Sequence, residues 1–136
     1  MNYYNYRIAH DLQLKDMWIF KADIAGCFNQ LHWAKSSAVQ FMGFVLQAGL
    51  LMIMLTCGFG VGVTPMVWIL LGDAMNMKVN AAGPCSVFTF VDDFLGAGSL
   101  MDALASQTVA HTVIRAVMGF EGLSVKRMSL PKRLRS

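Results

Sequence analysis

The chain has 136 residues, of which 56% are hydrophobic and only 14% are charged, and its mean hydropathy is +0.50. This composition excludes a disordered tail, a collagen-like rod and a charged coiled coil, and the length fits one domain with a real core. The net charge of +3 is uneven, because residues 121–136 carry five basic groups and one acidic group. That basic end indicates either a polyanionic partner or a solvated terminus. The hydrophobic excess predicts contact with a membrane or with other protein.

The first elements predicted along the chain are a strand, a short helical segment and a hairpin. Residues 17–23 (MWIFKAD) are typical of a short buried strand, and residues 26–35 fit one or two helical turns. Residues 40–55 are apolar and are divided by Ala48 and Gly49, which predicts two strands joined by a tight turn.

A long helix is predicted next, because Thr64 can cap free N–H groups and Pro65 fits the first helical position. Residues 80–84 (NAAGP) should stop this helix. The next run, residues 86–96, is rich in β-formers and is interrupted by the acidic pair Asp92 and Asp93, so we expect two strands with an acidic tip.

A second helix is predicted to open at Ser99, which has Asp102 three residues on, and to end at Gly119 or Gly122. Residues 123–125 then favour a last strand. The order β, α, β, β, α, β, β, α, β predicts an α+β fold with an antiparallel sheet backed by helices.

The uncharged run of 37 residues at 36–72 raises a membrane alternative. It is long enough for a transmembrane helix of about 20 residues, and residues 38–55 are the best candidate. Two glutamines and two glycines interrupt that candidate, and neither flank has a strong positive cluster to set its orientation.

The three cysteines, Cys27, Cys57 and Cys85, are about 30 residues apart and form no C-x-x-C pair. This spacing predicts neither a disulfide framework nor a zinc site, and it favours a reducing, intracellular compartment. Residues 1–11 lack the apolar core of a signal peptide.

The acidic residues near strand ends are the candidate chemical site. Asp92 and Asp93 follow an apolar strand, and Asp23 ends another. Carboxylates beside apolar strands need compensation, which a divalent metal provides, and carboxylates from neighbouring strands can converge on one point. The alternative is a solvated Asp-Asp hairpin turn.

Four segments in order resemble motifs of reverse transcriptases of the retrotransposon type. FVDD at 90–93 resembles the Y/F-x-D-D box, and DIAGCFNQL at 23–31 resembles the first catalytic motif. GFGVGVTPMVW at 58–68 resembles the second motif, usually P-F-G-x-x-x-x-P-x-x-F, and GLSVKRMSL at 122–130 resembles the next one. The resemblance covers about residues 17–130.

The resemblance implies a ferredoxin-like polymerase palm over residues 1–136, a single domain without fingers, primer grip or thumb. It implies RNA-directed DNA synthesis, in which a primer 3′-hydroxyl attacks a deoxynucleotide. Asp23, Asp92 and Asp93 would then be the catalytic residues and would bind two Mg²⁺ ions, with Mn²⁺ as the alternative ion. The implied partners are an RNA or DNA template-primer, a deoxynucleotide and the rest of a larger polymerase chain.

Substrate-binding residues are implied by the same motifs. Phe28 would be a steric gate beside the sugar 2′ position, with an ordinary core aromatic as the alternative. Phe59 and Gly60 would lie under the incoming nucleotide and the template. Lys126 or Arg127 would lie near the phosphates.

Departures from the family pattern keep other functions open. Gly58 replaces the usual Pro, and Trp68 replaces the usual Phe. A catalytically inactive retroelement remnant that binds nucleic acid or a partner is therefore one alternative, and a small membrane protein is the other. The resemblance disfavours the membrane protein, because it assigns the uncharged run to two strands and a helix.

Overall fold

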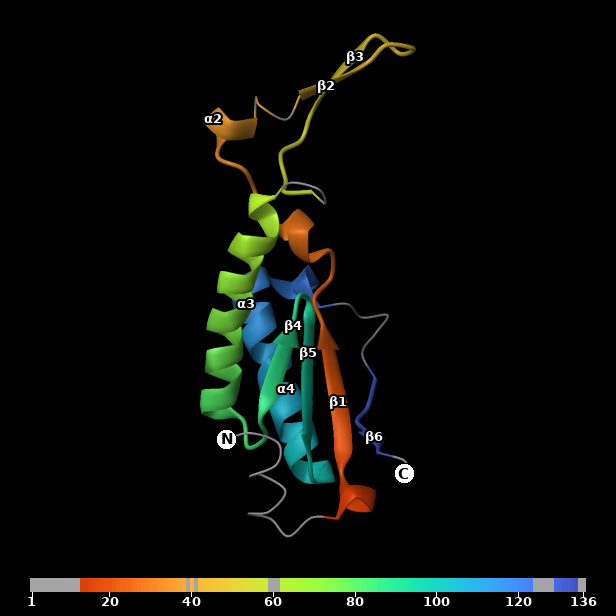
Figure 1. Cartoon of the computed structure of the whole chain (residues 1–136), viewed down its shortest axis with the longest axis vertical. Coiled ribbons are helices and arrows are strands. Elements are labelled where there is room, and N and C mark those ends of the chain that lie inside the picture. Colours follow the sequence, from red (N-terminus) through yellow and green to blue (C-terminus); the bar gives the residue numbers. More distant parts are fainter. Residues whose placement is uncertain (1–12, 39, 41, 59–61, 124–128, 135–136) are drawn as a thin grey trace.

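The computed structural model describes residues 13–38, 40, 42–58, 62–123 and 129–134, and their fold is α+β (Figure 1). The elements in chain order are the 3-10 turn η1 (Leu14–Asp16), β1 (Trp18–Asp23), the 3-10 turn η2 (Cys27–Gln30), α2 (Lys35–Ala38), β2 (Met42–Val45), β3 (Leu50–Ile53), α3 (Val63–Ala82), β4 (Val87–Phe90), β5 (Asp93–Gly98), α4 (Leu100–Met118), the 3-10 turn η4 (Phe120–Gly122) and β6 (Lys132–Arg133).

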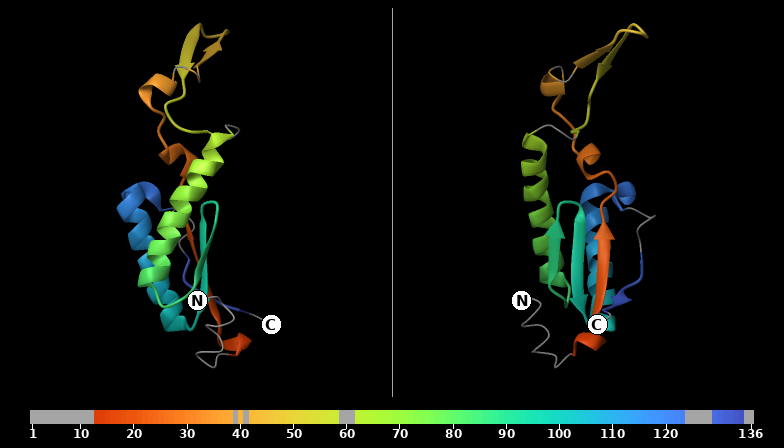
Figure 2. Two further views of the ribbon diagram at one scale, coloured as in Figure 1. Left: turned by 60° about the vertical axis from the view of Figure 1, so that its left-hand side comes forward. Right: turned by 45° about the vertical axis from the view of Figure 1, so that its right-hand side comes forward.

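The main sheet has the strand order β4-β5-β1-β6, and each neighbouring pair is antiparallel. Helices α3 and α4 lie on one side of this sheet, and no helix of the described residues covers its other side, which we call the open face (Figure 2). The predicted α+β class, with an antiparallel sheet backed by helices, is confirmed. The hairpin β2–β3 forms a second sheet of two strands.

The alternation of side chains along the central strands separates the core from the open face. On β1, Phe20 and Ala22 are buried toward the helices, and on β5 Phe94 is buried in the same way. Residues of the opposite parity, such as Ile19 and Leu95, lie on the open face and are partly exposed. The core is completed by residues from the two long helices: Trp68, Met75, Val79, Ala103, Ala110 and Ile114.

Helix α3 ends at Gly83, as predicted, but its start differs from the prediction. Gly62 is the N-cap, so Thr64 lies inside the first turn and is buried, and no side chain caps the helix. Pro65 is the third residue of the helix, whereas the sequence predicted that it would be the first. It is tolerated there because the first four N–H groups of a helix have no partner within the helix. The capping role predicted for Thr64 is wrong.

The start of helix α4 agrees with the sequence pattern. Ser99 is its N-cap, and the Ser99 hydroxyl accepts a hydrogen bond from the backbone N–H of Asp102. Gly119 closes the helix with a φ of 81°, a left-handed value that favours glycine. Of the predicted last strand at 123–125, Leu123 bridges to Ile24, and the other two residues lie outside the described part.

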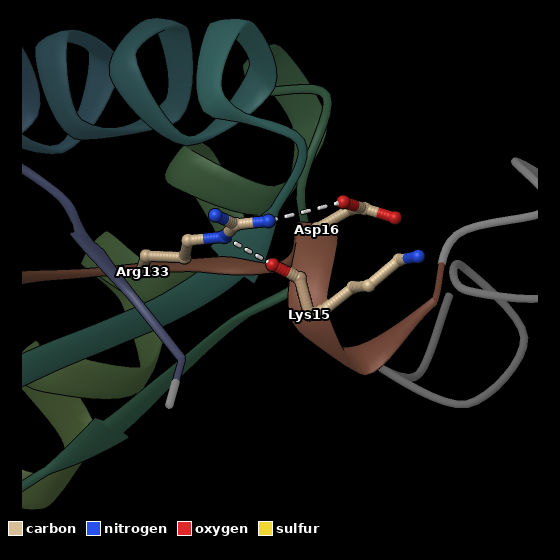
Figure 3. A network of polar contacts seen from close by, with 3 residues as sticks. All are labelled: Lys15, Asp16 and Arg133. Carbon is tan, nitrogen blue, oxygen red and sulfur yellow. Dashed lines mark hydrogen bonds and ion pairs between the residues drawn. The ribbon is translucent and has the colours of Figure 1, made fainter. Parts of the chain in front are cut away.

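The short strand β6 takes the edge of the main sheet beside β1. The Arg133 guanidinium donates to the backbone carbonyl of Lys15 and lies 3.4 Å from the Asp16 carboxylate (Figure 3). Next to this contact, Leu134 donates its backbone N–H to the Met17 carbonyl. Part of the basic C-terminal segment is therefore engaged in holding the sheet edge.

The β2–β3 hairpin confirms the two strands predicted in residues 40–55, and it extends away from the main sheet (Figures 1 and 2). Gly49, with a φ of 61°, allows the turn. The membrane candidate at 38–55 therefore contains this hairpin rather than a helix. Among the residues that the structure describes, no helix is both long enough and apolar enough to span a bilayer.

Gly96 on β5 provides a test of the packing between the sheet and its core. A Cβ atom at this position would lie 2.3 Å from Cε1 of Phe20, whose ring is almost fully buried. We expect Gly96→Ala to lower the free energy of unfolding by about 1–3 kcal/mol because Phe20 has to leave its position. Urea unfolding followed by circular dichroism measures this change.

The matched control is Gly43→Ala in the β2–β3 hairpin, where an added Cβ atom meets nothing within 4 Å. This variant should shift the unfolding midpoint little. Equal midpoints for Gly96→Ala and the parent chain would contradict the packing described for Phe20.

Candidate metal centre

Three carboxylates meet at the end of the central strand pair. Asp23 is the last residue of β1 and Asp93 is the first of β5, and the two lie directly opposite each other in the antiparallel register. Asp92 lies in the turn that joins β4 to β5. Each of the three offers an oxygen, and these oxygens all lie within 4.8 Å of one another. We call Asp23, Asp92 and Asp93 the acidic cluster.

The acidic cluster is partly shielded from water, which makes its mutual repulsion significant. Asp23 is only 5% exposed, and Asp92 and Asp93 are half-buried. The Lys21 ammonium lies 2.7 Å from Oδ2 of Asp93 and compensates for one of the three charges. A divalent cation at the cluster would compensate for further negative charge of the carboxylates.

Lys21 is a member of the site that sequence reasoning missed. Residues two apart on a strand share a face, so the spacing of Lys21 and Asp23 within the predicted strand was the signal. The position of Lys21 beside Asp93, on the neighbouring strand, depends on the β1–β5 register, in which Lys21 is opposite Leu95.

The oxygen atoms of the cluster fit a hard cation. Oδ1 of Asp93 is buried and accepts no hydrogen bond from the part of the chain that the structure describes. A buried carboxylate oxygen without a donor is unfavourable, and coordination to a cation removes that penalty. Carboxylate oxygens are the ligands that Mg²⁺ and Mn²⁺ prefer in proteins, so the residues present suit such an ion.

The turn that carries Asp92 is strained. Val91 and Asp92 form a two-residue connection between the paired residues Phe90 and Asp93. Val91 has a φ of 56°, which β-branched residues rarely adopt, and such a conformation costs about 1–3 kcal/mol. On the side of β1, the backbone N–H of Ile24 donates to the Asp92 carbonyl at 3.0 Å. The tertiary structure thus holds the acidic tip against its local preference.

Phe28 lies in turn η2, five residues after Asp23, and it packs into the main core. Its side chain is 8% exposed, and its ring meets Trp68 edge-on, with centroids 6.2 Å apart. These contacts are those expected of a core aromatic. The role of a steric gate stays a prediction.

Four other predicted site residues, Phe59, Gly60, Lys126 and Arg127, lie outside the described residues. The structure therefore brings together the three predicted carboxylates and places Phe28 in the core nearby.

The acidic cluster influences the pKa of the nearby thiol of Cys27. Burial raises the pKa of its thiol to about 11, and the negative charges of Asp92 and then Asp23 contribute in the same direction. A thiol with this pKa is neutral at physiological pH and reacts slowly. The sequence analysis treated Cys27 only as one of three cysteines.

No model of a known protein family matches this chain, and no curated protein matches it. Its function has to be inferred from its own residues and their geometry.

The raised pKa of Cys27 makes a prediction about pH and reactivity. Folded chain at pH 9 should be alkylated by iodoacetamide at Cys27 far more slowly than urea-unfolded chain, as measured by peptide mass spectrometry. The thiol of Cys27 has a higher pKa in the folded chain than in the unfolded chain. The free energy of unfolding is therefore unaffected by this group below pH 9 and falls as the pH rises toward about 11. Removal of a negative neighbour in Asp92→Asn should lower the pKa and speed alkylation.

The control for this measurement is Asp73→Asn on helix α3, which changes an exposed aspartate outside the acidic cluster. It should leave the alkylation rate of Cys27 unchanged. Equal rates in Asp92→Asn and Asp73→Asn would show that Cys27 does not sense the acidic cluster.

Proposed function

We propose that this chain is the ferredoxin-like palm of an RNA-directed DNA polymerase of the retrotransposon type. The observation that carries the proposal is the convergence of Asp23, Asp92 and Asp93 at the tip of an antiparallel strand pair. Their spacing in the sequence, and the order of the motifs around them, agree with the family that the sequence resembles.

In this proposal the acidic cluster binds two Mg²⁺ ions. Asp23, Asp92 and Asp93 would hold these ions, whose chemistry would be activation of the primer 3′-hydroxyl and stabilisation of the charge on the leaving pyrophosphate. Asp23 and Asp92 orient oxygens toward the ions, and Lys21 holds Asp93 in place through its ion pair. The template-primer and the deoxynucleotide approach from the open face of the sheet, which no helix of the described chain covers.

Partner surfaces belong to the same proposal. Most large apolar side chains of the β2–β3 hairpin are exposed, among them Phe44 and Leu50 at about 60%. An isolated two-stranded hairpin is marginal in water, so contact with the rest of a larger polymerase chain would stabilise it. Three free, buried cysteines suit an intracellular location.

A noncatalytic binding protein derived from such an element is the second candidate. The exposed apolar hairpin favours it, because binding a protein partner through this surface needs no metal. The two candidates differ in whether the acidic cluster binds ions and supports synthesis.

Metal binding is the direct test of the cluster. Titration of the chain with Mn²⁺, followed by electron paramagnetic resonance, should show bound ion that Mg²⁺ displaces. Asp92→Asn should weaken Mn²⁺ binding at least tenfold because it removes a charged ligand and leaves Asp23 and Asp93 alone. Asp73→Asn, outside the cluster, is the matched control and should bind as the parent chain does.

Failure of the parent chain to bind Mn²⁺ at millimolar concentration would remove the basis of the catalytic proposal. Binding that survives Asp92→Asn would place the ion elsewhere in the chain.

The gate role of Phe28 is tested in a complete polymerase that contains this palm. A rigid ring beside the sugar excludes a 2′-hydroxyl by volume, so Phe28→Val should raise ribonucleotide use relative to deoxyribonucleotide use by about tenfold or more. The measurement is the ratio of kcat/KM for the two nucleotides. This ratio is independent of how much enzyme folds, which matters because Phe28 also packs against Trp68.

Phe20→Val serves as the control, because it truncates another buried ring of the same core, in the middle of β1 and on the face of the sheet opposite to that of Asp23. Its nucleotide ratio should equal that of the parent enzyme. An unchanged ratio in Phe28→Val would assign Phe28 to the core alone.

A further inference from the structure

Helix α3 reaches the acidic hairpin tip through one side-chain hydrogen bond. The indole N–H of Trp68 donates to the backbone carbonyl of Val91 at 2.7 Å, across 23 residues of sequence. Trp68 is fully buried, and its ring is fixed in the core edge-on to Phe28. A buried indole N–H needs an acceptor, and here the acceptor is the residue next to Asp92.

Val91, whose carbonyl accepts the hydrogen bond from Trp68, is also the residue with the strained backbone. Val91 has its φ of 56° at the first position of a two-residue turn, where glycine is the usual residue when φ is positive. A valine keeps such a conformation only when its surroundings hold it. One turn beyond Trp68 on α3, Gly72 also lies near this carbonyl, and an added Cβ atom there would lie at an ordinary contact distance of 3.8 Å from it.

The hairpin tip is thus held from two elements. Trp68 on α3 binds the Val91 carbonyl, and the Ile24 N–H after β1 binds the Asp92 carbonyl. These two bonds fix the peptide groups on both sides of the Asp92 Cα atom, and so they set where its carboxylate lies relative to Asp23.

We propose that Trp68 is a positioning residue of the acidic cluster: its N–H holds the strained Val91–Asp92 turn so that the Asp92 carboxylate stays within shared-ligand distance of Asp23. The inference deepens the proposed function and rests on it for the identity of the bound ion. Trp68 itself offers no metal ligand and acts through the backbone of the turn.

The test uses the full chain with Trp68→Phe, which keeps an aromatic ring in the core and removes the donor. We expect the amide of Ile24 to exchange with deuterium about tenfold faster, because its acceptor is on the released turn. Amides at the far end of the same strand pair, such as that of Gly98, should keep their rates. The Mn²⁺ dissociation constant should rise about tenfold.

Trp33→Phe is the matched control, because it makes the same chemical change at a residue that belongs neither to helix α3 nor to the β4–β5 hairpin. It should leave both the Ile24 exchange rate and Mn²⁺ binding unchanged. Val91→Gly, added to Trp68→Phe, should recover much of the Mn²⁺ affinity because glycine adopts the positive φ without strain.

A second variant keeps the proposal testable if Trp68→Phe unfolds. Trp68→3-benzothienylalanine, placed by site-specific incorporation, keeps the size and shape of the ring and replaces only the N–H with sulfur. Unchanged Ile24 exchange in this variant would overturn the positioning role. An equal rise of exchange across all strands would also overturn it, since Trp68 would then support the fold as a whole.

The two readouts separate this proposal from the proposed function. If the parent chain binds no Mn²⁺, the metal-dependent function fails, and the exchange rate of Ile24 still decides whether Trp68 holds the turn. If the parent chain binds Mn²⁺ and Trp68→Phe binds it equally well, the positioning role fails and the metal centre stands.

Discussion

The antiparallel pairing of β1 with β5 is the constraint on which the rest of this structure depends. Six consecutive residue pairs, from Trp18 with Gly98 to Asp23 with Asp93, fix the register of the two central strands. Because side chains alternate with a period of two, a slip by one residue would turn Phe94 to the open face and Asp93 into the core. The burial of apolar side chains on one face therefore also fixes the place where the carboxylates meet.

The acidic cluster is held together against its own repulsion by contacts from several elements. Lys21, on the same face of β1 as Asp23, compensates for the charge of Asp93. The backbone N–H of Ile24, just after β1, donates to the Asp92 carbonyl in the turn. Trp68 binds the turn from helix α3. Burial of Asp23 at the strand end makes these contacts necessary, because partly buried like charges are unfavourable without compensation.

The apolar composition of the chain is explained only in part by its core. Helix α3 buries one face against the sheet and leaves Met66, Leu70 and Met77 on the other face at least 66% exposed. The β2–β3 hairpin is apolar on both faces and stands away from the main sheet. Surfaces of this kind are typical of protein interfaces.

The sequence by itself determined the elements and the carboxylate pair. A short apolar run predicted β1, and a run of β-formers interrupted by the acidic pair predicted the β4–β5 hairpin. Ala48 with Gly49 predicted the β2–β3 turn, and all of these signals are local. Ser99 with Asp102 likewise predicted the start of α4. The start of α3 was misplaced by two residues, since Gly62 took the cap position and a proline is tolerated anywhere in the first turn.

Only the tertiary structure decided what surrounds the carboxylates. The positions of Lys21 beside Asp93 and of Trp68 beside Val91 depend on strand register and helix packing, which join residues far apart in the sequence. The positive φ of Val91 contradicts its local preference, so no sequence rule predicts it. Local patterns specify which residues form an element, whereas the long-range packing of these elements fixes the distances between their side chains.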